Sequence, residues 1–147
     1  MDAIARLEAI EAITQLKGRY FYHMDSKDWG AWRDVFTNDI EMDVSAHFPD
    51  APDPSLHIYR GVDAVVATVS GSVGPIVTVH HGHTPLITIL NEDTASGIWA
   101  MEDHLIMADG SRMLGYGHYH EEYRKVGGAW KITRTRLARL KVLHVPA

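Results

Sequence analysis

The stretch Thr78-Val79-His80-His81-Gly82-His83-Thr84-Pro85 gathers three of the chain's ten histidines beside residues that alternate like a β-strand. The unperturbed pKa of histidine lies near neutrality, so a buried imidazole beside an acid can move protons at working pH. In an extended strand His80 and His81 point to opposite faces, so a three-histidine metal site requires a break at Gly82. The residues alone leave open a metal site, surface or subunit-contact histidines, and a single proton-transfer histidine, which we favour.

Three further titratable residues interrupt apolar patterns, where a buried polar group needs a partner. Tyr20 falls on the apolar side of a predicted helix, as a core residue or as a hydroxyl facing a cavity. Asp25 ends the same helix, either as the cap of the next helix or as the partner of a histidine. Asp103 shares one face of a predicted strand with Trp99 and Met101, so it is the acid least expected at its position.

The C-terminal strand contains a break in its alternation. Trp130 and Ile132 define an inward face that Leu137 contradicts, which predicts a β-bulge or strong twist between residues 133 and 136. After that shift, Leu137 and Arg139 both face the interior.

Three helices are expected to position these side chains. A long amphipathic helix begins after Asp2 and ends near Asp25, and a second helix capped by Ser26 or Asp28 continues to about Phe36. Valines at helical spacing predict a third helix after Gly61, ended by Gly71 or Gly74-Pro75. The apolar positions of the first helix are Ile4, Leu7, Ile10, Ile13, Leu16, Tyr20 and Met24.

The rest of the chain has the alternation and turn signals of strands. A turn-rich loop from Phe48 to Ser55 separates a first strand from a brief second one at Ile58-Tyr59. The expected longer strands span residues 40–44, 76–81, 86–91, 95–107, 113–126 and 130–142. Helices at the front and sequential strands at the back indicate an α+β domain in which the helices cover one face of a curved sheet.

Composition sets outer limits on function. Hydrophobic residues at 46% and charged residues at 22% of 147 fit a single globular domain over residues 1–147. A formal net charge of −5 offers no basic surface for nucleic acid, and no segment is apolar for long enough to span a membrane. The absence of cysteine excludes disulfides and thiolate metal sites, and together with an acidic N-terminal segment it favours a cytoplasmic protein. No nucleotide-binding or nucleophile-elbow motif occurs, so no cofactor is expected.

Several of these residues occur together in a known family. Combined, they resemble the SnoaL-like branch of the NTF2-like superfamily, from about Ile10 to Val142. Within that branch the chain is most similar to the bile-acid 7α-dehydratases, and it also resembles the scytalone dehydratases and hexachlorocyclohexane dehydrochlorinases. The motifs are Leu16-Lys17-Gly18-Arg19-Tyr20-Phe21, Asp25, Trp29, His80, Gly82-His83-Thr84-Pro85, Ile87-Thr88-Ile89, Gly97, Trp99 and Glu102-Asp103.

The resemblance implies a cone-shaped α+β barrel, with a curved, mixed, mostly antiparallel sheet covered by N-terminal helices around one deep pocket. It also implies elimination chemistry without a cofactor or metal. Tyr20, Asp25, His80 and Arg139 fall on the catalytic positions of the bile-acid enzymes. An Asp25–His80 pair would abstract the proton, Tyr20 would donate to an oxygen, and Arg139 would stabilise enolate charge or hold an acidic group.

Candidate substrate-binding residues are Trp99, Met101, Asp103, Tyr119 and Val44, the last at a position where the bile-acid enzymes have a second pocket tyrosine. This mixture suits a hydrophobic polycyclic or aromatic small molecule. A polyketide-cyclase-like or isomerase activity, a non-catalytic ligand-binding protein and an assembly subunit remain alternatives. A homo-oligomer is expected, with a trimer favoured and a dimer next, and no nucleic-acid or membrane partner.

Overall fold

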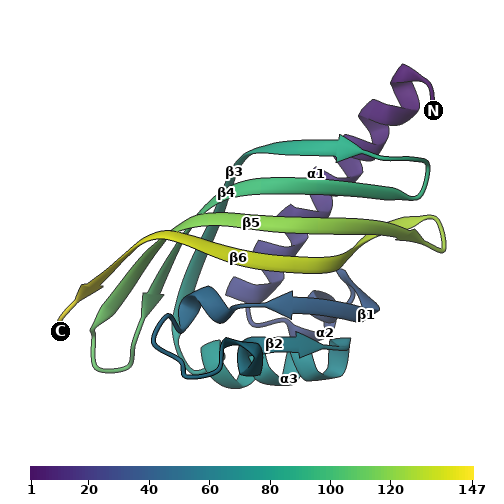
Figure 1. Cartoon of the computed structure of the whole chain (residues 1–147). Helices are drawn as coiled ribbons and strands as arrows, with labels where there is room; N and C mark the ends of the chain where they lie inside the picture. Colours follow the sequence, from purple (N-terminus) through teal and green to yellow (C-terminus); the bar gives the residue numbers. More distant parts are fainter.

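A computed structural model describes all residues from Met1 to Ala147. One six-stranded sheet, in the order β2-β1-β6-β5-β4-β3, forms the centre of the molecule, and three α-helices flank it (Figure 1). The helices are α1 (Ala3–Asp25), α2 (Trp29–Arg33) and α3 (Val62–Val73). The strands are β1 (Phe36–Asp43), β2 (Ile58–Arg60), β3 (Val77–Ile89), β4 (Thr94–Ile106), β5 (Arg112–Val126) and β6 (Ala129–Val145).

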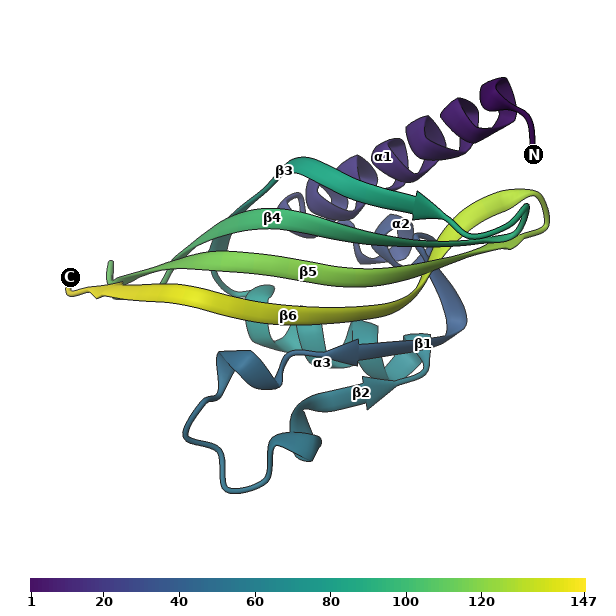
Figure 2. The same ribbon diagram turned by 45° about the horizontal axis from the view of Figure 1, so that its top comes forward.

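The sheet is mixed and mostly antiparallel. Strands β3 to β6 pair antiparallel in sequence order, β1 pairs parallel with β6, and β2 pairs antiparallel with β1. The long strands bend together, and α1 lies diagonally across one face of the sheet while α3 lies beside β1 and β2 (Figures 1 and 2). This arrangement confirms the expected α+β fold with N-terminal helices covering a curved sheet.

Helix α1 begins as expected, because the Asp2 carboxylate accepts a hydrogen bond from the backbone N–H of Ala5 at 2.8 Å. Its second half buries one side of the helix, at Ile13, Leu16, Lys17, Tyr20 and Met24. The prediction that Ile4 and Leu7 are core residues is wrong, since they are 70% and 66% exposed. Figure 1 gives the reason: the first turns of α1 extend past the edge of the sheet and have nothing to pack against.

Two element boundaries also differ from expectation. Helix α2 ends at Arg33 and Phe36 opens β1, where it pairs with Ile132 and is 3% exposed. Helical spacing predicts Phe36 in the second helix, but it is a strand residue that is buried by pairing with β6. The two short strands predicted on either side of Pro85 are one long strand, β3, with a register shift between His83 and Leu86. Proline has no backbone N–H to donate to a neighbouring strand. At a register shift in an edge strand this donor is not needed, so β3 continues through Pro85.

The predicted bulge in β6 is confirmed. Tyr123 pairs with Ile132 and Glu122 with Arg134, so Thr133 is the extra residue in β6. The phase shift directs Leu137 inward, at 7% exposure. It also directs the Arg139 side chain inward, where it is likewise 7% exposed.

A polar network lies inside the main core. The Lys17 ammonium is 2.5 Å from Glu121 Oε1, and both side chains are fully buried. Tyr123 donates its hydroxyl hydrogen to Glu121 Oε2 at 2.6 Å and accepts a hydrogen bond from Trp99 Nε1–H at 2.8 Å. Every charged group in this network therefore has a partner, which a buried charge requires.

None of the helices combines the length and the apolar character that a membrane-spanning helix needs.

Candidate active site

A cavity of about 130 Å³ opens between the end of α1, α3, β1 and the inner face of the sheet. Of its 17 lining residues, 11 are hydrophobic. Polar groups therefore enter an otherwise apolar space, which is the usual composition of a small-molecule site. Those with ionisable side chains are Tyr20, His47, Tyr59, His80, Asp103, Tyr119 and Arg139.

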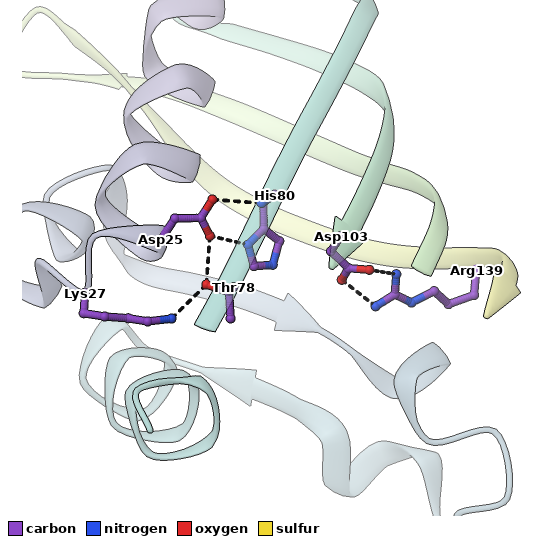
Figure 3. A network of polar contacts seen from close by, with 6 residues as sticks. All are labelled: Asp25, Lys27, Thr78, His80, Asp103 and Arg139. Carbon is purple, nitrogen blue, oxygen red and sulfur yellow. Dashed lines mark hydrogen bonds and ion pairs between the residues drawn. The ribbon is translucent and has the colours of Figure 1, made fainter. Parts of the chain in front are cut away.

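The first polar group is the Asp25–His80 pair, which joins the C-terminal end of α1 to β3 (Figure 3). Asp25 Oδ1 lies 2.7 Å from His80 Nδ1, and Asp25 Oδ2 accepts the backbone N–H of His80 at 2.8 Å. Asp25 therefore fixes both the ring and the backbone of His80. Because the carboxylate contacts Nδ1, the other ring nitrogen, Nε2, is left free on a residue that lines the cavity.

Further hydrogen bonds keep Asp25 ionised. Thr78 donates its hydroxyl hydrogen to Asp25 Oδ1 at 2.8 Å and in turn accepts one from the Lys27 ammonium at 2.8 Å (Figure 3). Burial alone would raise the pKa of Asp25, but the hydrogen bonds from His80 and Thr78 outweigh it and hold the pKa below its ordinary value. Asp25 is thus a carboxylate, positioned as an acceptor, throughout the neutral range.

A second polar group faces the cavity from β4 and β6. Arg139 makes a bidentate pair with Asp103, with both N–O distances at 2.8 Å (Figure 3). Arg139 Nη2 is also 2.9 Å from Nδ1 of His47, a residue of the short 3-10 helix η1 (Ser45–His47). The guanidinium is therefore occupied on both terminal nitrogens by groups of the protein itself.

His47 is the site residue that sequence reasoning missed. It lies in the turn-rich segment after β1, where neither strand nor helix periodicity marks an inward position. Burial lowers the pKa of His47, and the neighbouring Arg139 charge lowers it further. The available signal was indirect: Val44 leaves the cavity without the donor expected there, and a histidine follows three residues later.

Two buried tyrosines, Tyr20 and Tyr119, also line the cavity. Burial raises the pKa of both Tyr20 and Tyr119 well above the ordinary value, so both hydroxyl groups stay protonated. The Lys17 ammonium lies 3.8 Å from each ring centroid, and Lys17 itself does not line the cavity. These contacts hold the two rings between the core network and the cavity.

The remaining sequence-predicted residues divide into two groups. Val44, Asp103 and Tyr119 line the cavity, as do Tyr20, His80 and Arg139. Asp25 lies behind His80, and Trp99 and Met101 lie outside the lining, in a small buried cluster with Tyr119 and Leu137.

The other two histidines of the motif point elsewhere. His81 and His83 are exposed on β3, the edge strand, and His81 Nδ1 lies 3.1 Å from Glu102 Oε1. No group of three or more metal-ligating side chains is present in the molecule. The sheet face thus separates His80 from its neighbours, in agreement with strand alternation.

The fold and the cavity define a small α+β protein in which paired acids and bases face a mostly apolar cavity. Residues 5–136 match the model of the SnoaL-like domain, and the chain belongs to that family.

Solved structures with the same fold cover nearly the whole chain. A candidate scytalone dehydratase from Novosphingobium aromaticivorans is 23% identical, with a TM-score of 0.86 over 99% of this chain and 93% of that one. A hexachlorocyclohexane dehydrochlorinase from Novosphingobium barchaimii is 18% identical, with a TM-score of 0.83 over 98% and 94%. At these identities the likeness establishes the fold.

Proposed function

We propose that this protein is a cofactor-independent lyase that removes a proton next to a carbonyl group and expels water or another leaving group. The observation that carries the proposal is the 2.7 Å contact between Asp25 and His80 Nδ1, which leaves Nε2 of a cavity-lining imidazole without a partner. A neutral imidazole fixed in that tautomer is a proton acceptor at working pH.

In the proposed reaction, His80 Nε2 takes a proton from the carbon beside the carbonyl. The C–H electron pair moves toward the carbonyl oxygen as an enolate, and then forms the new carbon–carbon double bond as the bond to the leaving hydroxyl breaks. That hydroxyl takes the proton from His80 and departs as water, so the imidazole returns to its starting state. Asp25 stays ionised throughout and stabilises the transient imidazolium.

The other cavity groups have supporting roles. Tyr20 keeps its proton, because burial raises its pKa, and can donate a hydrogen bond to an oxygen of the substrate. Tyr119 and Val44 shape the wall, and Asp103 holds Arg139 in place. General acid–base assistance of this kind contributes about 10² to 10⁴ in rate for each group.

The substrate class follows from the lining. With 11 of 17 lining residues hydrophobic, the cavity favours a hydrophobic polycyclic or aromatic molecule. The dehydratase and dehydrochlorinase names of structurally similar proteins agree with an elimination. Similarity to the bile-acid 7α-dehydratases in particular stays a prediction, as does the cytoplasmic location.

A polyketide-cyclase-like or isomerase activity is the second candidate, because it also begins with proton abstraction by His80. A binding-only role is the third, in which Asp25 only satisfies a buried hydrogen bond. The lyase, the cyclase or isomerase, and the binding protein differ in what happens to the hydrogen on the carbon beside the carbonyl of a bound ligand. One experiment can therefore distinguish these three functions.

The experiment uses a panel of cyclic β-hydroxyketones, including a hydroxytetralone that becomes a naphthol when it loses water. Wild type and His80→Ala are incubated with each compound in deuterium oxide, and NMR follows binding, hydrogen exchange at the carbon beside the carbonyl, and alkene formation. Elimination that depends on His80 supports the lyase. Exchange alone indicates an isomerase or cyclase, binding alone indicates a binding protein, and the absence of all three contradicts the proposal.

The proposal includes self-association, with a trimer favoured and a dimer next. Apolar side chains lie exposed on the outer face of β3 to β5, where a second copy would cover them: Val77, Val79, Leu86, Ile98 and Tyr116. Sedimentation equilibrium at micromolar concentration tests this, and a monomer would contradict it.

A further inference from the structure

Two imidazoles line the same cavity, and their partners have opposite hydrogen-bonding character. His80 Nδ1 contacts a carboxylate, which when ionised can only accept a hydrogen bond. His47 Nδ1 contacts a guanidinium, which can only donate one. The two rings are therefore fixed in different tautomers by charged neighbours.

The consequence for each ring follows directly. On His80 the proton is on Nδ1, so Nε2 presents a lone pair. On His47 the lone pair is on Nδ1, so the proton is on Nε2. Neither Nε2 atom has a hydrogen-bond partner in the protein, and neither is among the buried polar atoms that lack one. Both are thus open groups on residues that line the cavity.

His47 is held in this state by its surroundings. Burial and the Arg139 charge lower its pKa, which keeps the ring neutral. Its backbone is fixed by a hydrogen bond from His47 N–H to the Val44 carbonyl oxygen at 2.9 Å. At the start of the same turn, the Asp43 carboxylate accepts hydrogen bonds from the backbone N–H and hydroxyl of Ser45, at 2.9 and 2.6 Å. The His47 ring, with its Nε2–H donor, therefore belongs to a turn that is held by backbone and side-chain hydrogen bonds.

The two terminal nitrogens of Arg139 have little capacity left for a substrate. Nη1 donates to Asp103 Oδ1 and lies 3.7 Å from Met101 Sδ, while Nη2 contacts Asp103 Oδ2 and His47. The Nε–H has no partner but is fully buried, so a substrate in the cavity does not reach it. Its charge is balanced by the Asp103 carboxylate at 2.8 Å, so an anionic substrate group gains little there. An uncharged oxygen that becomes negative during the reaction is the better match for a neutral N–H donor.

We propose that His47 is a catalytic residue whose Nε2–H donates a hydrogen bond to the carbonyl oxygen of an uncharged cyclic ketone. Asp103 and Arg139 are positioning residues that fix its tautomer. This inference rests on the proposed function: as His80 Nε2 removes the proton, charge develops on that oxygen, and the His47 donor stabilises it without transferring its own proton. The electron pair then expels the leaving group.

The test compares three variants with the wild type in the ketone assay. His47→Phe removes the donor, and His47→Gln supplies an amide N–H near the position of Nε2. His118→Phe on the outer sheet face is a matched control, used after sedimentation has shown that it keeps the oligomeric state of the wild type. The loss of one oxyanion donor is typically worth about 10² to 10³ in kcat. We expect that loss for His47→Phe with KM little changed, substantial rescue in His47→Gln, and wild-type rates in His118→Phe.

A readout independent of turnover is nitrogen NMR of protein labelled at histidine, near pH 7 where neutral imidazoles report their tautomers. The His47→Phe and His80→Phe spectra assign the two signals. The inference predicts Nε2–H for His47 and Nδ1–H for His80. The same tautomer for both, or a charged His47, overturns it even if the protein has no lyase activity. Wild-type activity in His47→Phe overturns it even if the proposed function holds.

Discussion

Two acid–base pairs, the fully buried Lys17–Glu121 and the partly buried Asp25–His80, have different consequences. Both carboxylate oxygens of Glu121 accept hydrogen bonds, from Lys17, Tyr123 and Thr135. Neither Lys17 nor Glu121 lines the cavity. The Asp25–His80 pair leaves one imidazole nitrogen open on the cavity wall. A buried charge pair is therefore a catalytic candidate only where it leaves a reactive atom without a partner.

The largest expected effect concerns Asp25→Asn. The amide can donate to His80 Nδ1 and so stabilise the tautomer with the proton on Nε2, which removes the base. The corresponding change in serine proteases costs about 10⁴ in kcat. We expect a loss of about 10³ to 10⁴ in the ketone elimination rate, with the cavity retained. A loss below tenfold in steady-state kinetics would show that Asp25 does not set the tautomer.

Lys17→Met should affect mainly the stability of the protein, whereas Asp25→Asn should affect mainly the elimination rate. Removal of one partner leaves the Glu121 carboxylate buried without its counter-charge, which typically costs about 3 to 5 kcal/mol. Urea unfolding measures this, and the matched double variant Lys17→Met/Glu121→Leu should recover most of the loss. A single variant as stable as the wild type would show that the Lys17–Glu121 pair contributes little to stability.

The dependence of stability on pH should identify Asp25. Its pKa in the folded protein is below the ordinary value of 3.8, so its contribution to stability is complete above about pH 4 and is lost as the pH falls through the lowered pKa. The difference in unfolding free energy between wild type and Asp25→Asn should therefore shrink as the pH falls below about 4. A difference that grows below pH 4 would contradict the direction of the pKa shift.

The smallest effect is expected for Lys27→Ala. Its ammonium reaches Asp25 only through the Thr78 hydroxyl and is partly solvated, so its removal should change stability by about 1 kcal/mol or less. The elimination rate should fall less than tenfold, because the direct contacts to Asp25 remain. A loss as large as that of Asp25→Asn would make Lys27 part of the proton-transfer unit.

The sequence was most informative where local periodicity and burial agree. The α1 cap at Asp2, the third helix and the β6 bulge that directs Arg139 inward all follow from patterns within a few residues. The inward orientation of His80 follows from alternation in the same way. These features are local, so sequence spacing was enough to predict them.

Contacts between distant segments were not predictable in this way. Lys17 has the sequence context of a surface residue, and only its contact with Glu121, 104 positions away, makes its burial possible. Asp103 and Arg139 were each identified as unusual, but their pairing depends on the registers of β4, β5 and β6. His47 lies in a turn with no periodicity, so its position in the cavity required the structure.

The most direct test of the central claim is the elimination rate of His80→Ala on the compound that the wild type converts best, measured beside its unfolding free energy. The predicted result is a loss of at least 100-fold, the lower end of the usual contribution of a general base, in a variant that stays folded and binds the ligand. An unchanged rate in the folded variant would show that His80 is not the base and would contradict the proposed function.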